Sequence, residues 1–298
     1  MSENGAARTV GVVGAGGIGL SVAADFVLHG FRVVLVDNVE SRLEQARGEL
    51  VEAVTYGPML RPALPRIPAE EALERVDFTT RLADLAACEF VVENVTESWE
   101  VKSRLYRELE SVLPPGVGIG VNTSSILIGR LAAETQRAPD VIGIHFMNPS
   151  YLKDAVEIMR GEKTSDACLA QVSELLTVLG KSAVVVGDFP GFVSNRISHL
   201  FFNEAIRVVE EQGVDPATVD AVFKKCFGHR MGPLETADLI GLDTVALTLD
   251  HLYDSYGDEK FRCADLLREM VKTERLGRKS GEGFYRYRPV QSVQPSQD

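Results

Sequence analysis

The sequence predicts an α/β protein, with a doubly wound, mostly parallel sheet followed by an all-α C-terminal domain. Short apolar runs alternate with helix-length amphipathic segments as far as residue 187, which is typical of strands and helices taking turns. A glycine-rich turn joins the first such run to the first helix. Beyond residue 188 helical periodicity continues without a convincing strand. We therefore expect two domains, 1–187 and 188–298.

The first strand and the turn after it give the strongest signal. Val10, Val12 and Val13 form a β-branched run that is too short for a helix and typical of a buried parallel strand. The motif G-x-G-x-x-G follows, and its glycines are Gly14, Gly16 and Gly19. In such a motif the first glycine allows a tight turn, the second lets a pyrophosphate approach the helix N-terminus, and the third lets helix and strand pack closely.

The acidic residue after the second strand decides the type of nucleotide. A second apolar run, residues 31–36, ends at Asp37, eighteen residues after Gly19. A carboxylate at this place accepts hydrogen bonds from a ribose 2′-OH and repels a 2′-phosphate. A lone G-x-G-x-x-G is weak evidence, but the strand, helix and acid around it predict a Rossmann domain. We expect the cofactor to be NAD rather than NADP, although Arg42 nearby is a mild counter-argument.

Composition excludes several classes of function. The net charge of −12 argues against nucleic acid or an anionic membrane as a partner. The four cysteines form no C-x-x-C pair, which predicts reduced thiols in a cytoplasmic protein and no metal site. Residues 1–8 lack the apolar segment of a signal peptide, no run is long enough to span a membrane, and the tail after Pro289 is polar.

A proline-rich excursion follows the second helix, which we expect at residues 39–56. Residues 57–68 contain four prolines, which exclude a continuous helix. Long loops in compact α/β domains are often functional. Arg61 and Arg66 are the only charges here, and they fit a solvated loop and a contact to the phosphate of a carrier equally well.

The remaining elements follow in order. We expect strands at residues 76–79, 90–93, 118–121, 141–144, 155–159 and 183–186, and helical segments at 83–87, 95–113, 128–136 and 164–179. In the second domain we expect helices at 192–211, 215–227, 236–256 and 264–274. The first of these carries more apolar surface than one exposed face needs, which predicts a homodimer.

Polar residues at strand ends are candidates for chemistry. His145 directly follows one predicted strand, and Glu157 lies twelve residues on in the next. An imidazole accepts a hydroxyl proton near neutral pH, and a carboxylate on its other nitrogen fixes the tautomer. From these residues alone a structural role for both is favoured. Ser124, in Asn122–Ser125, and Asn195 could bind substrate oxygen, but helix capping also explains them.

As a set, the motifs resemble the L-3-hydroxyacyl-CoA dehydrogenase family. The matching segments, in the family's order, are 12–19, 91–93, 122–125, 145–149, 156–158, 190–196 and 278–285. The resemblance outweighs the structural interpretation of His145 and Glu157. It implies a metal-free enzyme that oxidises C3 of a 3-hydroxyacyl thioester as NAD⁺ is reduced, and that dimerises through its helical domain.

The resemblance also implies individual roles. His145 is the base, Glu157 stabilises its protonated form, and Ser124 and Asn195 orient the hydroxyl or carbonyl oxygen. The residues that match cofactor contacts are Asp37, Glu97, Lys102, Ser124, Asn148 and Lys279, together with the glycines of the first turn.

Two departures from the family pattern bear on the substrate. In the family, a Ser and a Lys of this excursion contact coenzyme A, and their positions fall near Ala53 and Leu60. No lysine occurs here from residue 39 to 80, so the adenosine 3′-phosphate of coenzyme A lacks an expected partner. Lys153 and Asp154 stand where fatty-acid enzymes are apolar, which suits a short polar acyl group unless both point to solvent.

With these departures, the sequence resembles a polyketide-pathway branch of the family, which serves antibiotic biosynthesis. Its members oxidise glyceryl groups on an acyl carrier protein, toward hydroxymalonyl or methoxymalonyl extender units. We therefore expect this substrate, although the net charge of −12 does not favour docking of an acidic carrier. The alternatives are a 3-hydroxybutyryl-CoA dehydrogenase of fatty-acid type or a dehydrogenase of a free polar hydroxy acid. A non-enzymatic NAD-binding protein is disfavoured by the intact set of site residues.

Overall fold

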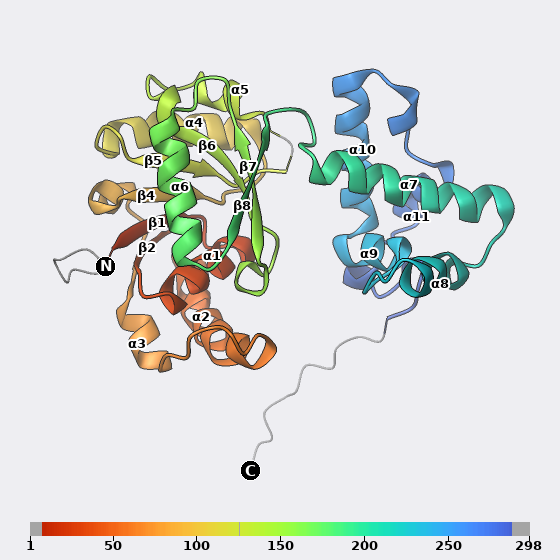
Figure 1. The fold of residues 1–298 in the computed structure, drawn as a ribbon, viewed down its shortest axis with the longest axis horizontal. Helices are drawn as coiled ribbons and strands as arrows, with labels where there is room; N and C mark the ends of the chain where they lie inside the picture. Colours follow the sequence, from red (N-terminus) through yellow and green to blue (C-terminus); the bar gives the residue numbers. More distant parts are fainter. Residues whose placement is uncertain (1–7, 125, 288–298) are drawn as a thin grey trace, which may run out of the picture. The chain divides into compact units, whose positions relative to one another are not determined.

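The computed structural model describes residues 8–124 and 126–287, and the chain divides into two compact units (Figure 1). The first unit ends at Phe192 and the second begins at Val193. The predicted polar N-terminal stretch before Arg8, Ser125 and the polar tail lie outside the described residues. Among the helices that are described, none is long and apolar enough to cross a membrane.

The first unit is built on one 8-stranded sheet with the order β3-β2-β1-β4-β5-β6-β7-β8. Neighbouring strands are parallel except β6 and β7, which are antiparallel. The strands are β1 (Thr9–Val13), β2 (Arg32–Val36), β3 (Val76–Thr79), β4 (Phe90–Glu93), β5 (Gly118–Val121), β6 (Val141–His145), β7 (Ala155–Arg160) and β8 (Ser182–Gly187). This topology confirms the predicted doubly wound, mostly parallel sheet.

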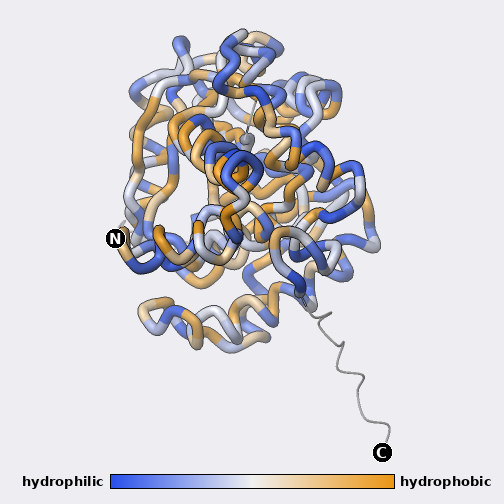
Figure 2. The backbone as a smooth tube through the Cα atoms, turned by 90° about the vertical axis from the view of Figure 1, so that its right-hand side faces the viewer, coloured by the Kyte–Doolittle hydropathy of each residue, from blue (hydrophilic) through white to orange (hydrophobic). Residues whose placement is uncertain are grey.

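Helices cover both faces of the sheet, as continuous apolar strands require. The helices α1 (Gly17–Leu28), α2 (Glu40–Leu60) and α6 (Asp166–Val178) share one core, and α4 (Trp99–Val112), α5 (Ile128–Ala132) and the 3₁₀ turn η1 (Leu82–Ala87) share the other. Along β1, Val10 and Val12 face the first core and Val13 faces the second. Figure 2 shows hydrophobic and hydrophilic stretches alternating along the chain. Shorter pieces are α3 (Ala69–Glu74), η2 (Ala138–Asp140) and η3 (Ser150–Leu152).

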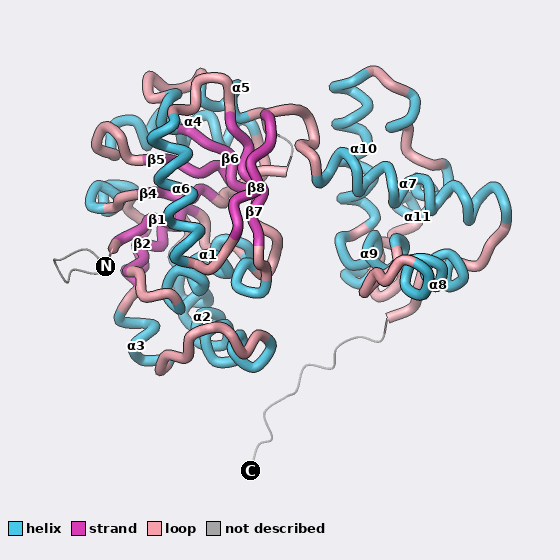
Figure 3. Tube along the Cα trace, in the orientation of Figure 1, coloured by secondary structure: helices cyan, strands magenta, loops and turns pink. Residues whose placement is uncertain are grey.

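The described part of the second unit consists of helices, loops and isolated bridges (Figure 3). Its elements are α7 (Ser194–Gln212), α8 (Pro216–Cys226), α9 (Pro233–Ile240), α10 (Leu242–Tyr256), η4 (Glu259–Phe261), α11 (Asp265–Lys272) and η5 (Arg278–Ser280). Their apolar faces meet in a core of their own. The helical C-terminal region is therefore confirmed.

Several predicted helix boundaries are wrong. The helix expected at 236–256 is two helices, because Gly241 adopts a φ of +105° between α9 and α10. Helix α2 continues to Leu60 through Pro58, so the first proline of the excursion does not exclude helix. A proline in the last turn removes only one backbone hydrogen bond, and the amide of Arg61 still bonds to the carbonyl of Gly57 at 2.9 Å.

Two helices of the first unit are shorter than the helices predicted at residues 95–113 and 128–136. Helix α4 begins at Trp99 because the Ser98 hydroxyl caps it by accepting the amide of Val101. Helix α5 ends at Ala132. At its start, the Asp188 carboxylate accepts the amides of Ile128 and Gly129 at 2.9 and 2.7 Å, so Asp188 is tied to the first unit.

Candidate active site

The glycine turn after β1 is shaped by close backbone contacts. Gly14 has a φ of +93°, and a Cβ there would lie 2.7 Å from the carbonyl oxygen of Asn94. A Cβ at Gly19 would lie 1.9 Å from the carbonyl oxygen of Gly14, so helix and turn touch directly. A Cβ at Gly16 would meet nothing within 4 Å. Folding alone therefore does not require glycine at Gly16, and the space in front of it is open to a ligand.

Asp37 holds this turn from the end of β2. Its Oδ2 accepts the amide of Ala15 at 2.9 Å, and its Oδ1 accepts the amide of Val39 at 3.0 Å. Asp37, Gly14 and Gly16 line a cavity of about 590 Å³. Turn and acid therefore line one cavity, and the binding of a nucleotide by these residues stays a prediction.

The presence of Arg42 near Asp37 was the counter-argument in favour of NADP. In the structure, its side chain is bound by other groups of the protein. Its Nε donates to the carbonyl of Ala15 at 2.7 Å, and its two terminal nitrogens bind the Glu49 carboxylate at 2.6 and 2.5 Å. The hydrogen bond from Arg42 lowers the pKa of Glu49, which keeps the pair ionised. A 2′-phosphate would have to compete with this bidentate pair for the guanidinium.

His145 and Glu157 occupy opposite positions on the antiparallel strands β6 and β7. Residues in such register have side chains on the same face of the sheet. His145 Nδ1 lies 3.1 Å from Glu157 Oε2, and the two side chains are only 8% and 9% exposed. The carboxylate accepts the Nδ1 proton, which leaves the lone pair on Nε2. Ser124 Oγ lies 3.3 Å from that Nε2, so Glu157, His145 and Ser124 form a continuous chain.

The loop that carries Ser124 is held by Glu97. The Glu97 carboxylate accepts a hydrogen bond from the Thr123 hydroxyl and another from the amide of Ser124, the latter at 3.0 Å. Sequence reasoning missed this link between Glu97 and Ser124. An acid in the loop after β4, facing the loop after β5 at the ligand edge of the sheet, was the available signal.

Lys102 lies behind that loop and is completely buried. Its Nζ is 2.7 and 2.8 Å from the two carboxylate oxygens of Glu93, 3.1 Å from the carbonyl of Asn122 and 3.7 Å from Glu97. Burial raises the pKa of Glu93, and the Lys102 ammonium opposes that shift. Lys102 therefore supports the two loops from within, and its contact to a cofactor stays a prediction.

A second buried ion pair, which was not predicted from the sequence, fixes the segment that carries Asn148. Lys181 Nζ lies 3.0 Å from Asp25 Oδ2, with both side chains fully buried. Lys181 also donates to the carbonyls of Ser150 and Lys153 at 2.8 and 2.7 Å, and the Ser150 hydroxyl donates to Asp25 at 2.5 Å. The chain after His145 is thereby tied to α1.

Arg61 and Asp154 bind each other. Their side chains form an ion pair of 2.6 Å, in which Asp154 is 85% exposed. Arg61 also donates to the carbonyls of Tyr151 and Lys153 at 3.2 and 3.1 Å. The predicted influence of Asp154 on the acyl group gains no support from this position.

The other two predicted site residues belong to the second unit. Asn195 is in the first turn of α7, and its carbonyl lies 3.0 Å from His199 Nδ1. Lys279 lies in η5 and pairs with Asp243 at 2.5 Å. The motif around Lys279 is fixed by Asp238, whose carboxylate accepts the amides of Phe284 and Tyr285 at 3.0 Å each. Phe284 and Tyr285 end the matching segment 278–285.

Comparison with known proteins identifies the family. The model described as "3-hydroxyacyl-CoA dehydrogenase, NAD binding domain" matches residues 9–189, and the model of the C-terminal domain matches residues 191–287. The chain belongs to the 3-hydroxyacyl-CoA dehydrogenase family. The predicted NAD cofactor and the predicted class of enzyme, an NAD-dependent 3-hydroxyacyl dehydrogenase, are thereby confirmed.

Three relatives within this family match over almost their whole length. The chain is 41% identical over 277 residues to a probable 3-hydroxybutyryl-CoA dehydrogenase of Deinococcus radiodurans, covering 93% of this chain and 99% of that protein. It is 41% identical over 290 residues to the 3-hydroxybutyryl-CoA dehydrogenase of Bradyrhizobium diazoefficiens, covering 96% and 97%. The crystal structure of (S)-3-hydroxybutyryl-CoA dehydrogenase from Ralstonia eutropha matches with a TM-score of 0.89 and 38% identity, covering 95% of this chain and 100% of that one.

Proposed function

We propose that this dehydrogenase oxidises the 3-hydroxyl group of a short 3-hydroxyacyl-CoA, 3-hydroxybutyryl-CoA in the first place, to the 3-oxoacyl thioester. Relatives named as 3-hydroxybutyryl-CoA dehydrogenases, 41% identical over nearly the whole chain, support this substrate. The observation that carries the chemistry is the chain of contacts from Glu157 through His145 to Ser124. It holds the imidazole with its second nitrogen beside a hydroxyl that can bind oxygen.

In this reaction the residues have separate roles. His145 Nε2 takes the proton of the substrate hydroxyl as the C3–H bond breaks, and Glu157 stabilises the imidazolium that forms. NAD⁺ supplies the acceptor for the hydride that leaves C3. The Ser124 hydroxyl, and Asn195 from the second unit, orient the reacting oxygen. The released proton passes from His145 to solvent, so the products are the ketone, NADH and H⁺.

The remaining predicted residues serve the cofactor in this proposal. The turn of Gly14, Gly16 and Gly19 receives the pyrophosphate, and Asp37 binds the ribose hydroxyls. Further contacts are proposed for Glu97, Lys102, Asn148 and Lys279. We also propose a homodimer formed by the helical unit, which exposes Ile197 at 63%, Phe227 at 68% and Leu247 at 55%.

A glyceryl group on an acyl carrier protein is the second candidate. The absence of lysine from residue 39 to 80 favours it, because adenosine 3′-phosphate lacks the expected partner there. The relatives nevertheless support the CoA ester better than this carrier substrate, which the sequence analysis favoured.

One assay separates the two substrates. NADH formation is measured with 3-hydroxybutyryl-CoA and with glyceryl-carrier protein at equal concentrations, and we expect the CoA ester to be oxidised faster. A clear preference for the carrier-bound group would overturn the choice of substrate. The variant His145→Gln tests the chemistry, since it should abolish turnover and leave NADH binding nearly intact. Unchanged turnover would remove His145 from the mechanism.

A further inference from the structure

The side chain of Asn122 holds the main chain next to His145. The backbone pairing of β5 with β6 ends at Val121 and Gly143, two residues before His145. Asn122 directly follows β5, and its Oδ1 accepts the amide of Phe146 at 3.2 Å. The side chain therefore continues the contact between the two strands beyond the point where their backbone pairing ends.

The orientation of this side-chain amide is fixed by its partners. A backbone N–H only donates and a carbonyl only accepts, so the Asn122 atom that faces Phe146 is the oxygen. Asn122 Nδ2 then donates to Asn94 Oδ1 at 2.7 Å, and Asn94 Nδ2 donates to the carbonyl of Val92 at 3.1 Å. The two ends of this chain admit a single order of donors and acceptors. Two uncharged amides thereby join the ends of β4, β5 and β6.

The backbone of Asn122 is held on both sides. Its amide donates to the carbonyl of Glu93 at 2.9 Å, and its carbonyl accepts from Lys102 Nζ at 3.1 Å. Ser124 follows two residues later, and its Oγ lies 3.3 Å from His145 Nε2. Asn122 thus connects the loop that carries the hydroxyl to the strand end that carries the imidazole.

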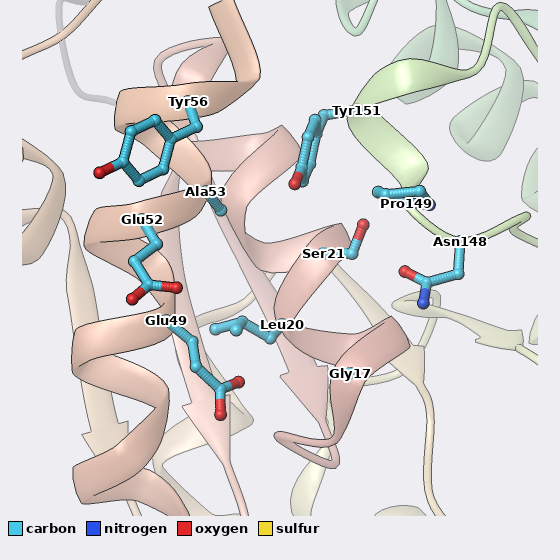
Figure 4. A pocket seen from close by; sticks show the side chains of 10 residues that line it. All are labelled: Gly17, Leu20, Ser21, Glu49, Glu52, Ala53, Tyr56, Asn148, Pro149 and Tyr151. Carbon is cyan, nitrogen blue, oxygen red and sulfur yellow. The ribbon is translucent and has the colours of Figure 1, made fainter. Parts of the chain in front are cut away.

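The next contact that anchors the chain lies further from His145. The amide of Ser150 donates to the Ser21 hydroxyl at 2.5 Å, and Figure 4 shows Ser21 on α1 beside the segment that begins at Asn148. Because Ser150 is five residues beyond His145, this contact constrains the strand end less than the contact from Asn122 does.

We propose that Asn122 is a positioning residue, which sets the place of the His145 base relative to Ser124 and the reacting oxygen. The inference rests on the proposed oxidation of a 3-hydroxyacyl thioester, in which His145 takes the hydroxyl proton. The amide of Asn122 is uncharged and takes no part in the proton transfer. A displacement of about 1 Å at a reacting group can lower a rate about 100-fold. Loss of the Asn122 amide should therefore lower kcat and leave the binding of cofactor and substrate unchanged.

The test uses variants of the full-length protein in steady-state kinetics with 3-hydroxybutyryl-CoA. Asn122→Leu is similar in size but removes both side-chain hydrogen bonds, and we expect kcat to fall about 10-fold to 100-fold. KM and the Kd of NADH should stay within about twofold of wild type. Asn122→Asp restores an oxygen for the amide of Phe146, so its kcat should exceed that of Asn122→Leu by about threefold or more. Asn122→Ala takes the place of Asn122→Leu if the larger side chain prevents folding.

A matched control removes an amide contact at the opposite end of β5. Gln171 Nε2 donates to the carbonyl of Gly116 at 2.9 Å, in the loop before that strand. Gln171→Leu should keep kcat within about twofold of wild type, because this contact is remote from the site.

Three results would overturn the inference and leave the proposed oxidation in place. The first is a kcat for Asn122→Leu within about threefold of wild type, and the second is an equal loss of kcat in Gln171→Leu. The third is weaker NADH binding by Asn122→Leu at an unchanged kcat, which would make Asn122 a cofactor contact instead. Failure of the wild-type protein to oxidise either proposed substrate would remove the proposed function, and the inference with it.

Discussion

The role of Glu157 beside His145 can be tested by removing the negative charge of Glu157 alone. Glu157→Gln keeps the size of the side chain, and its amide oxygen can still accept the Nδ1 proton of His145. The tautomer of the imidazole is therefore retained, while the negative charge that stabilises the imidazolium is lost. The variant changes the energy of the protonated base without changing which nitrogen faces the substrate.

The size of the effect follows from the geometry. The two side chains meet at 3.1 Å and are 8% and 9% exposed, so solvent screens the interaction little. A hydrogen bond to a charged group contributes about 1.5–3 kcal/mol. Because about 1.4 kcal/mol corresponds to a factor of ten in rate, kcat should fall about 10-fold to 150-fold. Glu157→Ala also removes the orienting contact and should lose more.

Steady-state kinetics with 3-hydroxybutyryl-CoA and a fluorescence titration of NADH measure this outcome. We expect kcat to fall while KM and the Kd of NADH stay near the wild-type values, since the imidazolium forms only during the reaction. Glu162→Gln, on an exposed glutamate after β7, is the matched control and should behave as wild type. A kcat for Glu157→Gln within about threefold of wild type would refute the assigned role.

Three further changes test other parts of the structure. Asp37→Ala should weaken NADH binding about tenfold or more and NADPH binding less, because a 2′-phosphate gains from losing the carboxylate; equal losses would contradict the ribose contact. Lys181→Met leaves Asp25 charged and buried, so urea denaturation should give a free energy of unfolding lower by about 3–5 kcal/mol, and a loss below about 1 kcal/mol would contradict the buried pair. Burial lowers the pKa of His199 from 6.5, so below that pH the unfolded chain binds more protons and stability falls as the pH falls. His199→Gln should flatten this dependence, measured as the free energy of unfolding against pH, and an unchanged slope would exclude His199 as its source.

The sheet could be predicted closely because its strands are short apolar runs with glycine, proline or polar residues at their ends. The bounds of β4 and β5 coincide with the predicted ranges 90–93 and 118–121. Helix ends were less predictable, since they depend on single conformations and caps such as those of Gly241 and Ser98. The helix propensities of the residues do not reveal the φ of Gly241 or the hydrogen-bond partner of Ser98.

The candidate site could be predicted only in part, for a related reason. His145 and Glu157 become a pair only if β6 and β7 are antiparallel and in this register, which the local residues do not decide. The motifs of the family supplied that information. Lys181 and Asp25 belong to none of the matching segments and are far apart in sequence, so nothing in the chain linked them before the fold was known.

Two carboxylates of this sheet show what would separate the proposed catalytic pair from a structural one. Glu93 ends β4 and Glu157 lies opposite the end of β6, and each holds one nitrogen base within 3.1 Å. The partner of Glu93 is the ammonium of Lys102, which is fully buried and bonded to three oxygen atoms, so it has no basic lone pair to offer. The partner of Glu157 is an imidazole, whose second nitrogen stays basic while the first is held. In the proposed mechanism, the same arrangement stabilises the loops at the end of β4 and moves a proton at the end of β6.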